Sequence, residues 1–422
     1  MLAKGTSDYT PEEKILRNKI VHTIQHLFER YGFAPLETAT LERLETLTAK
    51  YAGGDEIIKE IYKLTDQGKR DLGLRYDLTV PLARYIGENP NIKMPFKRYE
   101  IGKVFRDGPI KAGRMREFWQ CDGDVIGASS MLADAELLKL AHDVFTQLNM
   151  DVVIKVNNRK LLNGIMSAAG ITQNKDGAIL SLDKIEKFGA AAVKKELNEK
   201  CFDDTQINEV LKLTTIKGSN ESIIKKLEPL INDSEGEQGI KEIRELLHFL
   251  KLFNTNVELD ISLARGLAYY TGTIYEVYLK SGTITSSLAA GGRWDTMIGK
   301  FLKTEKPYPA VGISFGLEPI TAALKSQTQK SVTKVYIVPI NTLDQSIIML
   351  QKFRNEGITA DIDLVGRSPG KNMNHADVYG IPFAVFIGEA EMSAGKVKLK
   401  ELKTGKEILV TVEQAIDIVK KN

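Results

Sequence analysis

The first apolar pattern in the chain has helical spacing. Apolar side chains recur one helical turn apart at Ile20, Ile24, Leu27 and Tyr31. Upstream, Thr10 can cap the helix, Pro11 suits a first-turn position that needs no N–H, and Glu13 can close a capping box. Gly32 supplies the stop. The pattern predicts an amphipathic helix of about five turns, followed by a strand over residues 33–38.

Between residues 95 and 127 the period changes to two, which is typical of strands. One face of the first predicted strand carries Arg98, Glu100, Gly102, Val104 and Arg106. After a loop over residues 107–113, one face of the second carries Arg116, Phe118, Gln120, Asp122 and Asp124. Two sequential strands joined by a short loop with Gly and Pro suggest an antiparallel pair. A face this rich in Arg, Gln and Asp predicts the floor of a polar cleft.

Downstream, strand patterns surround one long helical stretch. A helix is predicted over residues 134–150 and a strand over 151–157, and strands return at 256–264, 272–280 and 283–290. The intervening residues, from 158 to about 250, are rich in Lys and Glu and mostly helical in period. Beyond a linker at 322–333, strands over 335–339, 358–364 and 383–388 alternate with helices over 343–355 and 371–379.

These patterns predict a mixed α/β (α+β) chain with two domains. The first, over residues 1–325, is discontinuous because a helical insertion interrupts it at about 158–250. The second is an α/β domain over residues 332–422.

Composition excludes several classes of protein. The chain has 422 residues, 43% of them hydrophobic, so it is neither largely disordered nor fibrous. Its net charge of +3, from 58 basic and 55 acidic residues, does not indicate nucleic-acid binding by bulk charge. Two cysteines and five histidines without a ligand pattern support neither a disulfide framework nor a zinc site. With no signal-peptide or membrane-span pattern, we expect a cytoplasmic protein with no membrane partner.

Basic residues are concentrated locally. Eight basic residues stand against Glu100 and Asp107 between positions 93 and 116: Lys93, Lys97, Arg98, Lys103, Arg106, Lys111, Arg114 and Arg116. Lysines on an edge strand that resist aggregation are one explanation. Arginines around a Gly-Pro loop fit better with recognition of a phosphate or carboxylate, for which the guanidinium fork is suited. We therefore favour an anion site.

Candidate cation binders lie beside this basic segment. Gln120 and Asp124 share the polar strand face, and Asp77 and Thr79 lie in a nearby segment. A site for both an anion and an ammonium group would suit an amino acid, alone or with a nucleotide. Two glycine-containing segments, residues 265–272 and 289–295, each follow a predicted strand. Taken alone, ordinary turns explain these glycines best.

Together these segments resemble the histidyl-tRNA synthetases, a family of class II aminoacyl-tRNA synthetases, over nearly the whole chain. The helix and strand around Tyr31-Gly32-Phe33 resemble the family's motif 1 dimer element. Residues 104–122 resemble motif 2, and residues 263–272 resemble the signature specific to histidine enzymes. The resemblance implies a class II antiparallel-sheet catalytic domain, with the insertion touching the tRNA acceptor arm, and a C-terminal anticodon-binding domain.

The resemblance also implies an activity. Histidine would be activated by ATP to histidyl-adenylate with release of pyrophosphate, and then transferred to the terminal ribose of histidine tRNA. ATP is thus a substrate, Mg²⁺ is expected to arrive with it, and no zinc is expected. The motif 1 element implies a homodimer.

Residue roles follow by position from the same resemblance. Arg106 and Arg265 would be catalytic and face the α-phosphate and the histidine carboxylate, with Arg114 near the outer phosphates. Asp77, Leu78, Thr79, Gln120 and Asp124 would surround the α-amino group. Tyr269 and Tyr270 would lie beside the imidazole.

Three positions depart from the family pattern. Gly108 stands where motif 2 commonly has Glu, and Ala268 stands where the signature usually has an acidic residue. Pro319 stands where motif 3 normally has the arginine that stacks on adenine. A non-catalytic paralogue, such as the regulatory subunit of ATP phosphoribosyltransferase or a tRNA-sensing module, is therefore the alternative. The retained Arg106, Arg265 and tyrosines favour the enzyme.

Overall fold

The computed structural model describes residues 1–48, 58–110, 115–264, 269–282, 284–327 and 329–421. The chain divides into two compact units. One consists of Met1–Ser7 and Ile20–Ala323, and the other of Asp8–Lys19 and Leu324–Asn422. Both contain helices and sheets, so the predicted mixed α/β class is confirmed.

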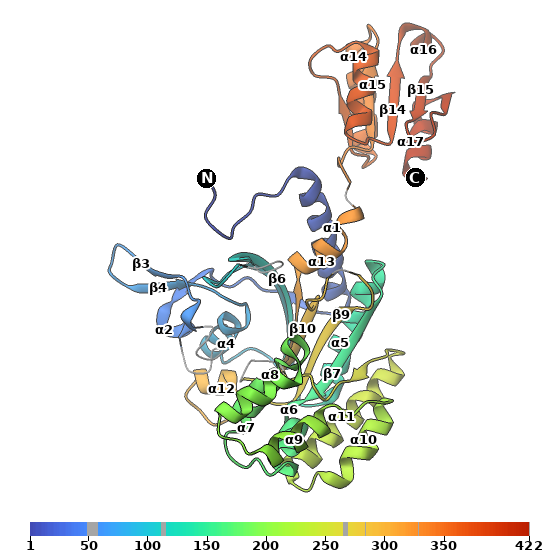
Figure 1. Cartoon of the computed structure of the whole chain (residues 1–422). Helices are drawn as coiled ribbons and strands as arrows, with labels where there is room; N and C mark the ends of the chain where they lie inside the picture. Colours follow the sequence, from blue (N-terminus) through green and yellow to red (C-terminus); the bar gives the residue numbers. More distant parts are fainter. Residues whose placement is uncertain (49–57, 111–114, 265–268, 283, 328, 422) are drawn as a thin grey trace. The chain divides into compact units, whose positions relative to one another are not determined.

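A mostly antiparallel sheet forms the centre of the first unit (Figure 1). Its strands lie in the order β1 (Ala34–Pro35), β5 (Phe96–Phe105), β6 (Glu117–Ile126), β11 (Ala310–Gly316), β10 (Ala289–Arg293), β9 (Thr273–Leu279), β7 (Val152–Asn158) and β8 (Glu258–Leu259). Strands β5 and β6 pair antiparallel from Phe96–Ile126 to Phe105–Glu117, as the period-two pattern predicts. Successive side chains point to opposite faces, so Gln120, Asp122 and Asp124 of β6 share one face and Cys121 lies on the other.

Helices cover the apolar face of this sheet. The C-terminal half of α1 (Pro11–Arg30) packs Phe28 against Tyr99, with ring centroids 5.4 Å apart, and against Phe315 at 5.9 Å. Helix α5 (Met131–Gln147) contacts β7, β10 and β11 and runs alongside β7 in Figure 1. The capping box predicted for α1 is confirmed, because the Thr10 and Glu13 N–H groups donate to each other's side chains at 3.0 and 3.3 Å.

A smaller sheet and several helices pack beside the main sheet. A second sheet has the order β2 (Leu41–Arg43), β4 (Asp71–Leu74) and β3 (Lys63–Thr65). The nearby helices are α2 (Leu44–Leu47), α4 (Thr79–Glu88) and α12 (Met297–Phe301), whereas α13 (Leu317–Ala323) contacts β6. A buried apolar cluster that includes Tyr76, Ile126 and Trp294 joins this layer to the main sheet.

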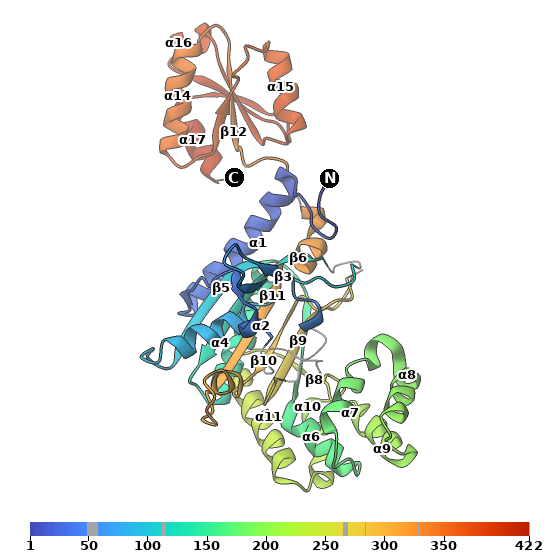
Figure 2. The same ribbon diagram turned by 90° about the vertical axis from the view of Figure 1, so that its left-hand side faces the viewer.

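The predicted helical insertion is present between β7 and β8. It contains α6 (Arg159–Ala168), α7 (Lys175–Leu182), α8 (Ile185–Glu199), α9 (Asp204–Thr214), α10 (Asn220–Leu227), the short 3-10 helix η1 (Glu228–Leu230) and α11 (Ser234–Leu252). Figure 2 shows these helices gathered into one lobe. Helix α11 packs along α6, and the chain returns through β8, which pairs in parallel with β7. The insertion therefore joins the sheet through two adjacent strands.

The second unit is the expected alternation of strands and helices. Its sheet has the order β13 (Ala360–Ile362), β12 (Val335–Pro339), β14 (Phe383–Ile387), β15 (Val397–Glu401) and β16 (Glu407–Val410). Its helices are α14 (Leu343–Asn355), α15 (Pro369–Val378), α16 (Glu389–Ser393) and α17 (Val412–Lys421), with η2 (Lys325–Gln327) at its start. Its core includes Ile337, Phe353 and Val385.

Four sequence interpretations were wrong in detail. The strand expected over residues 283–290 begins only at Ala289, as β10, among the described residues. The strand expected over residues 256–264 is only Glu258–Leu259, because Asp260 accepts hydrogen bonds from Ser262 and Leu263 and turns the chain. The strand expected over 33–38 is only Ala34–Pro35. Gly291 and Gly292 are not in a turn but inside β10, where a Cβ on Gly291 would lie 2.0 Å from the Gly312 carbonyl oxygen. Glycine is required there by close strand packing.

Within the part of the chain that the structure describes, no helix is both long and apolar enough to span a bilayer.

Candidate active site

The polar face of β5, β6 and β11 forms the floor of the candidate site. Strand register places Gln120 between Gly102 and Gly316, Asp122 between Glu100 and Ser314, and Asp124 between Arg98 and Gly312. The Gln120 amide nitrogen donates to Ser314 Oγ at 2.9 Å. The predicted polar floor is therefore present, with Gln120 and Asp124 on it.

This floor buries more carboxylates than cations. Asp77, Glu100, Asp122 and Asp124 are each at most 8% exposed, and the buried arginines beside them are Arg75 and Arg98. Arg98 Nη2 lies 2.8 Å from Asp124 Oδ2, and Arg75 Nη1 lies 2.7 Å from Glu100 Oε1. Four carboxyl groups stand against two guanidinium groups. Even with Asp122 protonated near neutral pH, since its pKa is raised to about 8, the acidic groups outnumber the cations, and a buried charge is costly unless it is paired. The floor therefore favours a cationic ligand.

Burial raises the proton affinity of the two central carboxyl groups. Burial, only partly opposed by Arg98, raises the pKa of Asp122 to about 8 and that of Asp124 to about 6. The pKa of Asp77 is also raised by burial. Asp122 Oδ1 and Gln120 Oε1 are buried and have no hydrogen-bond partner within the described chain. Two acceptors thus remain for a ligand or a water molecule.

A glycine makes room for Asp124. A Cβ on Gly312 would lie 1.9 Å from Asp124 Oδ1, which is closer than any real Cβ contact. The Asp124 carboxylate therefore occupies the volume that a side chain on β11 would fill.

The loop before α4 supplies the next predicted residues. Asp77 Oδ1 accepts hydrogen bonds from the N–H groups of Thr79 at 3.2 Å and Val80 at 3.0 Å, so this carboxylate caps α4. The Leu78 carbonyl accepts a hydrogen bond from Arg98 Nη2 at 2.9 Å. The sequence did not indicate that Leu78 would act through its backbone.

Arg106 lies at the end of β5 and is held from two sides. Its Nε donates to the Tyr76 carbonyl at 3.0 Å, and its guanidinium lies 5.1 Å from the centroid of the Phe118 ring. Its charge lowers the pKa of Asp77, against the larger effect of burial. Arg106 therefore lies near Asp77, at the edge of the acidic floor.

Most of the other basic residues of this segment are paired. Lys97 pairs with Glu136 at 2.8 Å, Lys103 with Glu117 at 2.7 Å, and Arg116 with Asp107 at 3.1 Å. Paired cations attract an anion less strongly than the sequence count implies. Arg114, predicted to contact the outer phosphates, lies outside the described residues.

The predicted tyrosine pair borders β10. The rings of Tyr269 and Tyr270 are 4.7 Å apart, and Tyr270 is 8% exposed. Tyr270 covers Gly292, since a Cβ there would lie 2.8 Å from its ring carbons. Arg265 and Ala268, just upstream, lie outside the described residues.

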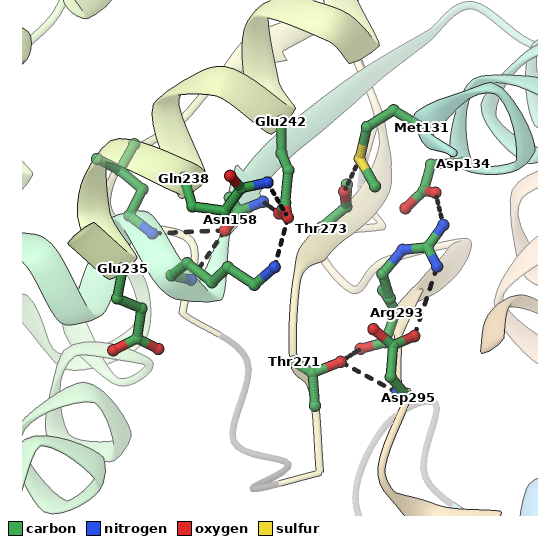
Figure 3. Close-up of polar contacts among 12 residues, drawn as sticks. Met131, Asp134, Asn158, Glu235, Gln238, Glu242, Thr271, Thr273, Arg293 and Asp295 are labelled. Atoms are coloured by element: carbon green, nitrogen blue, oxygen red, sulfur yellow. Dashed lines mark hydrogen bonds and ion pairs between the residues drawn. The ribbon is translucent and has the colours of Figure 1, made fainter. Parts of the chain in front are cut away.

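A buried ionic network supports this border, and sequence reasoning missed it (Figure 3). Arg293, 2% exposed, pairs with Asp134 of α5 and with Asp295 at 3.4 Å. Its backbone carbonyl accepts a hydrogen bond from the Thr271 N–H at 2.8 Å, and Thr271 Oγ1 accepts one from the Asp295 N–H at 3.0 Å. The segment after the tyrosines is therefore tied to β10 and α5. The only feature of the sequence that could have indicated this network is the charged Arg293 directly after Gly291 and Gly292.

The divergent motif 3 segment packs at the other end of β11. The Glu318 carboxylate accepts hydrogen bonds from the Trp119 N–H at 3.1 and 3.3 Å, which ties α13 to β6. Pro319 lies in the first turn of α13, where its missing N–H costs no helical hydrogen bond. A Cβ on Gly316 would lie 2.8 Å from the Pro319 ring, so the two residues are in close contact.

Among the described residues, no group of three or more His, Cys, Asp or Glu side chains has the geometry to hold a metal ion.

Comparisons with known proteins place the chain in a family. The family model of histidyl-tRNA synthetases matches residues 5–320, and that of an anticodon-binding domain matches residues 334–422. Histidine–tRNA ligase 1 of Bacillus thuringiensis is 47% identical over 412 residues, covering 96% of each chain. That of Bacillus cereus is 46% identical over 419 residues, covering 98% of this chain and 96% of the relative.

Solved structures agree. A histidyl-tRNA synthetase from Nostoc sp. PCC 7120 superposes with a TM-score of 0.88 at 30% identity, covering 100% of this chain and 99% of that one. A Bacillus halodurans structure described as an ATP phosphoribosyltransferase regulatory subunit/histidyl-tRNA synthetase superposes with a TM-score of 0.76 at 21% identity, covering 92% and 97%. At that identity the second likeness concerns the fold alone.

Proposed function

The chain belongs to the histidyl-tRNA synthetase family and is an aminoacyl-tRNA ligase that joins histidine to tRNA, and we propose how its cleft does so. In the first step, a histidine carboxylate oxygen attacks the α-phosphorus of ATP. The bond to pyrophosphate breaks, and histidyl-adenylate forms. In the second step, a ribose hydroxyl at the 3′ end of histidine tRNA attacks the histidyl carbonyl carbon, and AMP leaves.

The acidic excess of the floor carries the assignment of the substrate's amino group. The α-ammonium group of histidine is a cation with three N–H donors, and the carboxylates of Asp77 and Asp124 with the Gln120 amide oxygen are acceptors on one buried surface. Thr79, at the start of α4, would add its hydroxyl as a further acceptor for the ammonium group. Leu78 would position Arg98 through the hydrogen bond that its carbonyl oxygen accepts. The cation would neutralise part of the buried charge.

The arginines act on the developing charge of the phosphate. Arg106 is held by the Tyr76 carbonyl and would contact the α-phosphate and the histidine carboxylate. By the family resemblance, Arg265 would contact the α-phosphate from the side opposite Arg106, and Arg114 would contact the outer phosphates. Tyr269 and Tyr270 would read the imidazole by ring contact and hydroxyl hydrogen bonds. ATP brings Mg²⁺, which would offset negative charge on the phosphates.

Histidine-dependent ATP–pyrophosphate exchange tests the first step without tRNA. We expect Arg106→Ala to lower the exchange rate by orders of magnitude, because a lost charge contact to the transition state costs several kcal/mol. Asp124→Ala should raise the KM for histidine far more than that for ATP. Exchange that is absent with every amino acid, in a folded protein, would contradict the proposal and favour the non-catalytic paralogue. Chelation by EDTA should stop the exchange, and added Mg²⁺ should restore it.

The second unit would hold the anticodon of the tRNA. A pocket of about 470 Å³ on α15 is lined by Arg367, Gly370, Lys371, Asn374, His375 and Val378. The His375 ring, which lines this pocket beside Arg367 and Lys371, lies 4.7 Å from the exposed Tyr379 ring, so basic and aromatic groups are close together there, as is typical of nucleotide sites. Lys371→Ala should raise the KM for tRNA and leave pyrophosphate exchange unchanged. An equal loss in exchange would contradict this assignment.

The remaining proposals concern assembly and location. We propose a homodimer through the motif 1 element, checked by light scattering of the eluting protein, where a monomer of 47.0 kDa would contradict it. We also propose a cytoplasmic location, where ATP and tRNA are both available.

A further inference from the structure

The junction between the main sheet and the helical insertion lies beside the segment that carries the tyrosine pair. The chain enters the insertion at Asn158, the last residue of β7, and returns through β8, which pairs with Lys155 and Val156. Four residues after β8 it reaches Leu263, and the tyrosine pair follows at Tyr269 and Tyr270. The junction and the substrate pocket are thus neighbours in the chain and in the sheet.

Asn157 ties the upstream flank of the tyrosine segment to β7. Its side chain is fully buried, and Nδ2 donates to the carbonyl oxygens of Ile261 at 3.2 Å and Leu263 at 2.8 Å. Its Oδ1 accepts a hydrogen bond from the Asn158 N–H at 2.8 Å. Both ends of this amide are therefore used, and it can hold only one orientation.

Arg159 ties the downstream flank. Its N–H donates to the Gly272 carbonyl at 2.8 Å, while β7 and β9 pair Asn158 with Thr273. Three consecutive residues of the junction thus hold the chain on both sides of Tyr269 and Tyr270. Hydrogen bonds to the Leu263 and Gly272 carbonyls therefore fix one residue on each side of the tyrosine pair, and fixing a residue before the ligand arrives lowers the ordering cost of binding.

The same junction is anchored inside the insertion. Asn158 caps α6, accepting hydrogen bonds from the N–H groups of Lys160 at 2.8 Å and Leu161 at 3.4 Å. Its Nδ2 donates to Glu242 Oε2 of α11 at 2.8 Å (Figure 3). Glu242 is 6% exposed and also pairs with Lys160. A shift of α6 against α11 would therefore act on Asn158, the residue next to Asn157.

We propose that Asn157 is a positioning residue and that the Asn157–Arg159 junction couples the insertion to the histidine pocket. The junction holds the tyrosine segment at both flanks, and the packing of α6 on α11 sets the junction. The affinity for histidine should then depend on Asn157, Asn158 and Glu242, although these residues contact neither the substrate nor the tyrosine pair. This inference rests on the proposed function, since the pocket must bind histidine for the coupling to be measured.

Pyrophosphate exchange, measured without tRNA, tests the proposal. Asn157→Ala removes both carbonyl contacts, and we expect the KM for histidine to rise about 10- to 100-fold, the range of two hydrogen bonds, with the KM for ATP within about twofold. Asn158→Asp keeps a good cap for α6 but places a second carboxylate against Glu242, and it should raise the KM for histidine in the same direction. A merely structural role would lower both substrates' kcat/KM together.

Asn163→Ala is the matched control. Asn163 also donates from α6 to Glu235 Oε1 of α11 at 2.8 Å, but this contact is exposed, whereas the Asn158–Glu242 contact at the junction is buried. Removing it should leave the buried junction in place and both KM values unchanged. Circular dichroism melting shows whether each variant is folded. An unchanged histidine KM in folded Asn158→Asp, or an equal rise in Asn163→Ala, would overturn the proposal even if Asn157→Ala fails to fold. Absence of exchange in the wild type would instead reject the proposed function.

Discussion

Replacing Gly312 with alanine tests whether the position of Asp124 determines histidine binding. An alanine Cβ at this site would lie 1.9 Å from Asp124 Oδ1, whereas real Cβ contacts begin at 3.0 Å, so the carboxylate must move by at least 3.0 − 1.9 = 1.1 Å. Gly312 is in the middle of β11, paired with β6 and β10, so the backbone cannot easily yield instead. The movement would break the 2.8 Å contact between Asp124 and Arg98.

The size of the effect on histidine binding follows from the proposed hydrogen bond between Asp124 and the histidine ammonium group, which the displaced carboxylate could no longer make. A hydrogen bond to a charged group contributes about 1.5–3 kcal/mol, which corresponds to a factor of about 10 to 150 in affinity. We therefore expect the KM for histidine in pyrophosphate exchange to rise by that factor, with little change in the KM for ATP. Gly370→Ala is the control, because a Cβ there meets no atom within 4 Å.

A double-mutant cycle isolates the mechanism. In an Asp124→Ala background the clash is absent, so adding Gly312→Ala should cost almost nothing further. Losses that simply add, or a matching rise in the KM for ATP, would refute the reasoning and assign Gly312 to general packing.

Two further predictions concern stability. Burial raises the pKa of Asp122 from its ordinary value of 3.8 to about 8. The contribution of this group to stability is therefore fully present below about pH 4 and is lost as the pH rises to about 8. Asp122→Asn should gain stability relative to the wild type over that range in urea unfolding at several pH values, and no such trend would appear if the carboxyl group were ionised in the folded state. Arg293→Met leaves Asp134 buried without its partner and should lower the free energy of unfolding by about 3–5 kcal/mol. The double variant with Asp134→Leu should recover part of this loss. A loss below about 1 kcal/mol, as is typical of an exposed ion pair, would contradict the burial of the pair.

Local signals predicted the strands and helices that carry the site. Alternation along β5 and β6 depends only on the two-residue period, so the faces of Gln120 and Asp124 could be assigned before any partner strand was known. The capping box of α1 is likewise a short-range signal. The prediction of a strand over residues 256–264 was wrong because the Asp260 side chain accepts a hydrogen bond from Ser262 and stabilises a turn, which competes with an extended backbone.

Long-range pairing explains what the sequence could not reveal. Arg98 counts as part of a basic cluster in the sequence, yet in the fold it faces Asp124 on the next strand and the Leu78 carbonyl 20 residues earlier. Lys97 likewise meets Glu136 of α5. A count of charges along residues 93–116 therefore does not give the sign of the floor, which is acidic once its partners are included. That sign matters chemically, because an acidic floor next to Arg106 separates a place for an ammonium group from a place for a phosphate.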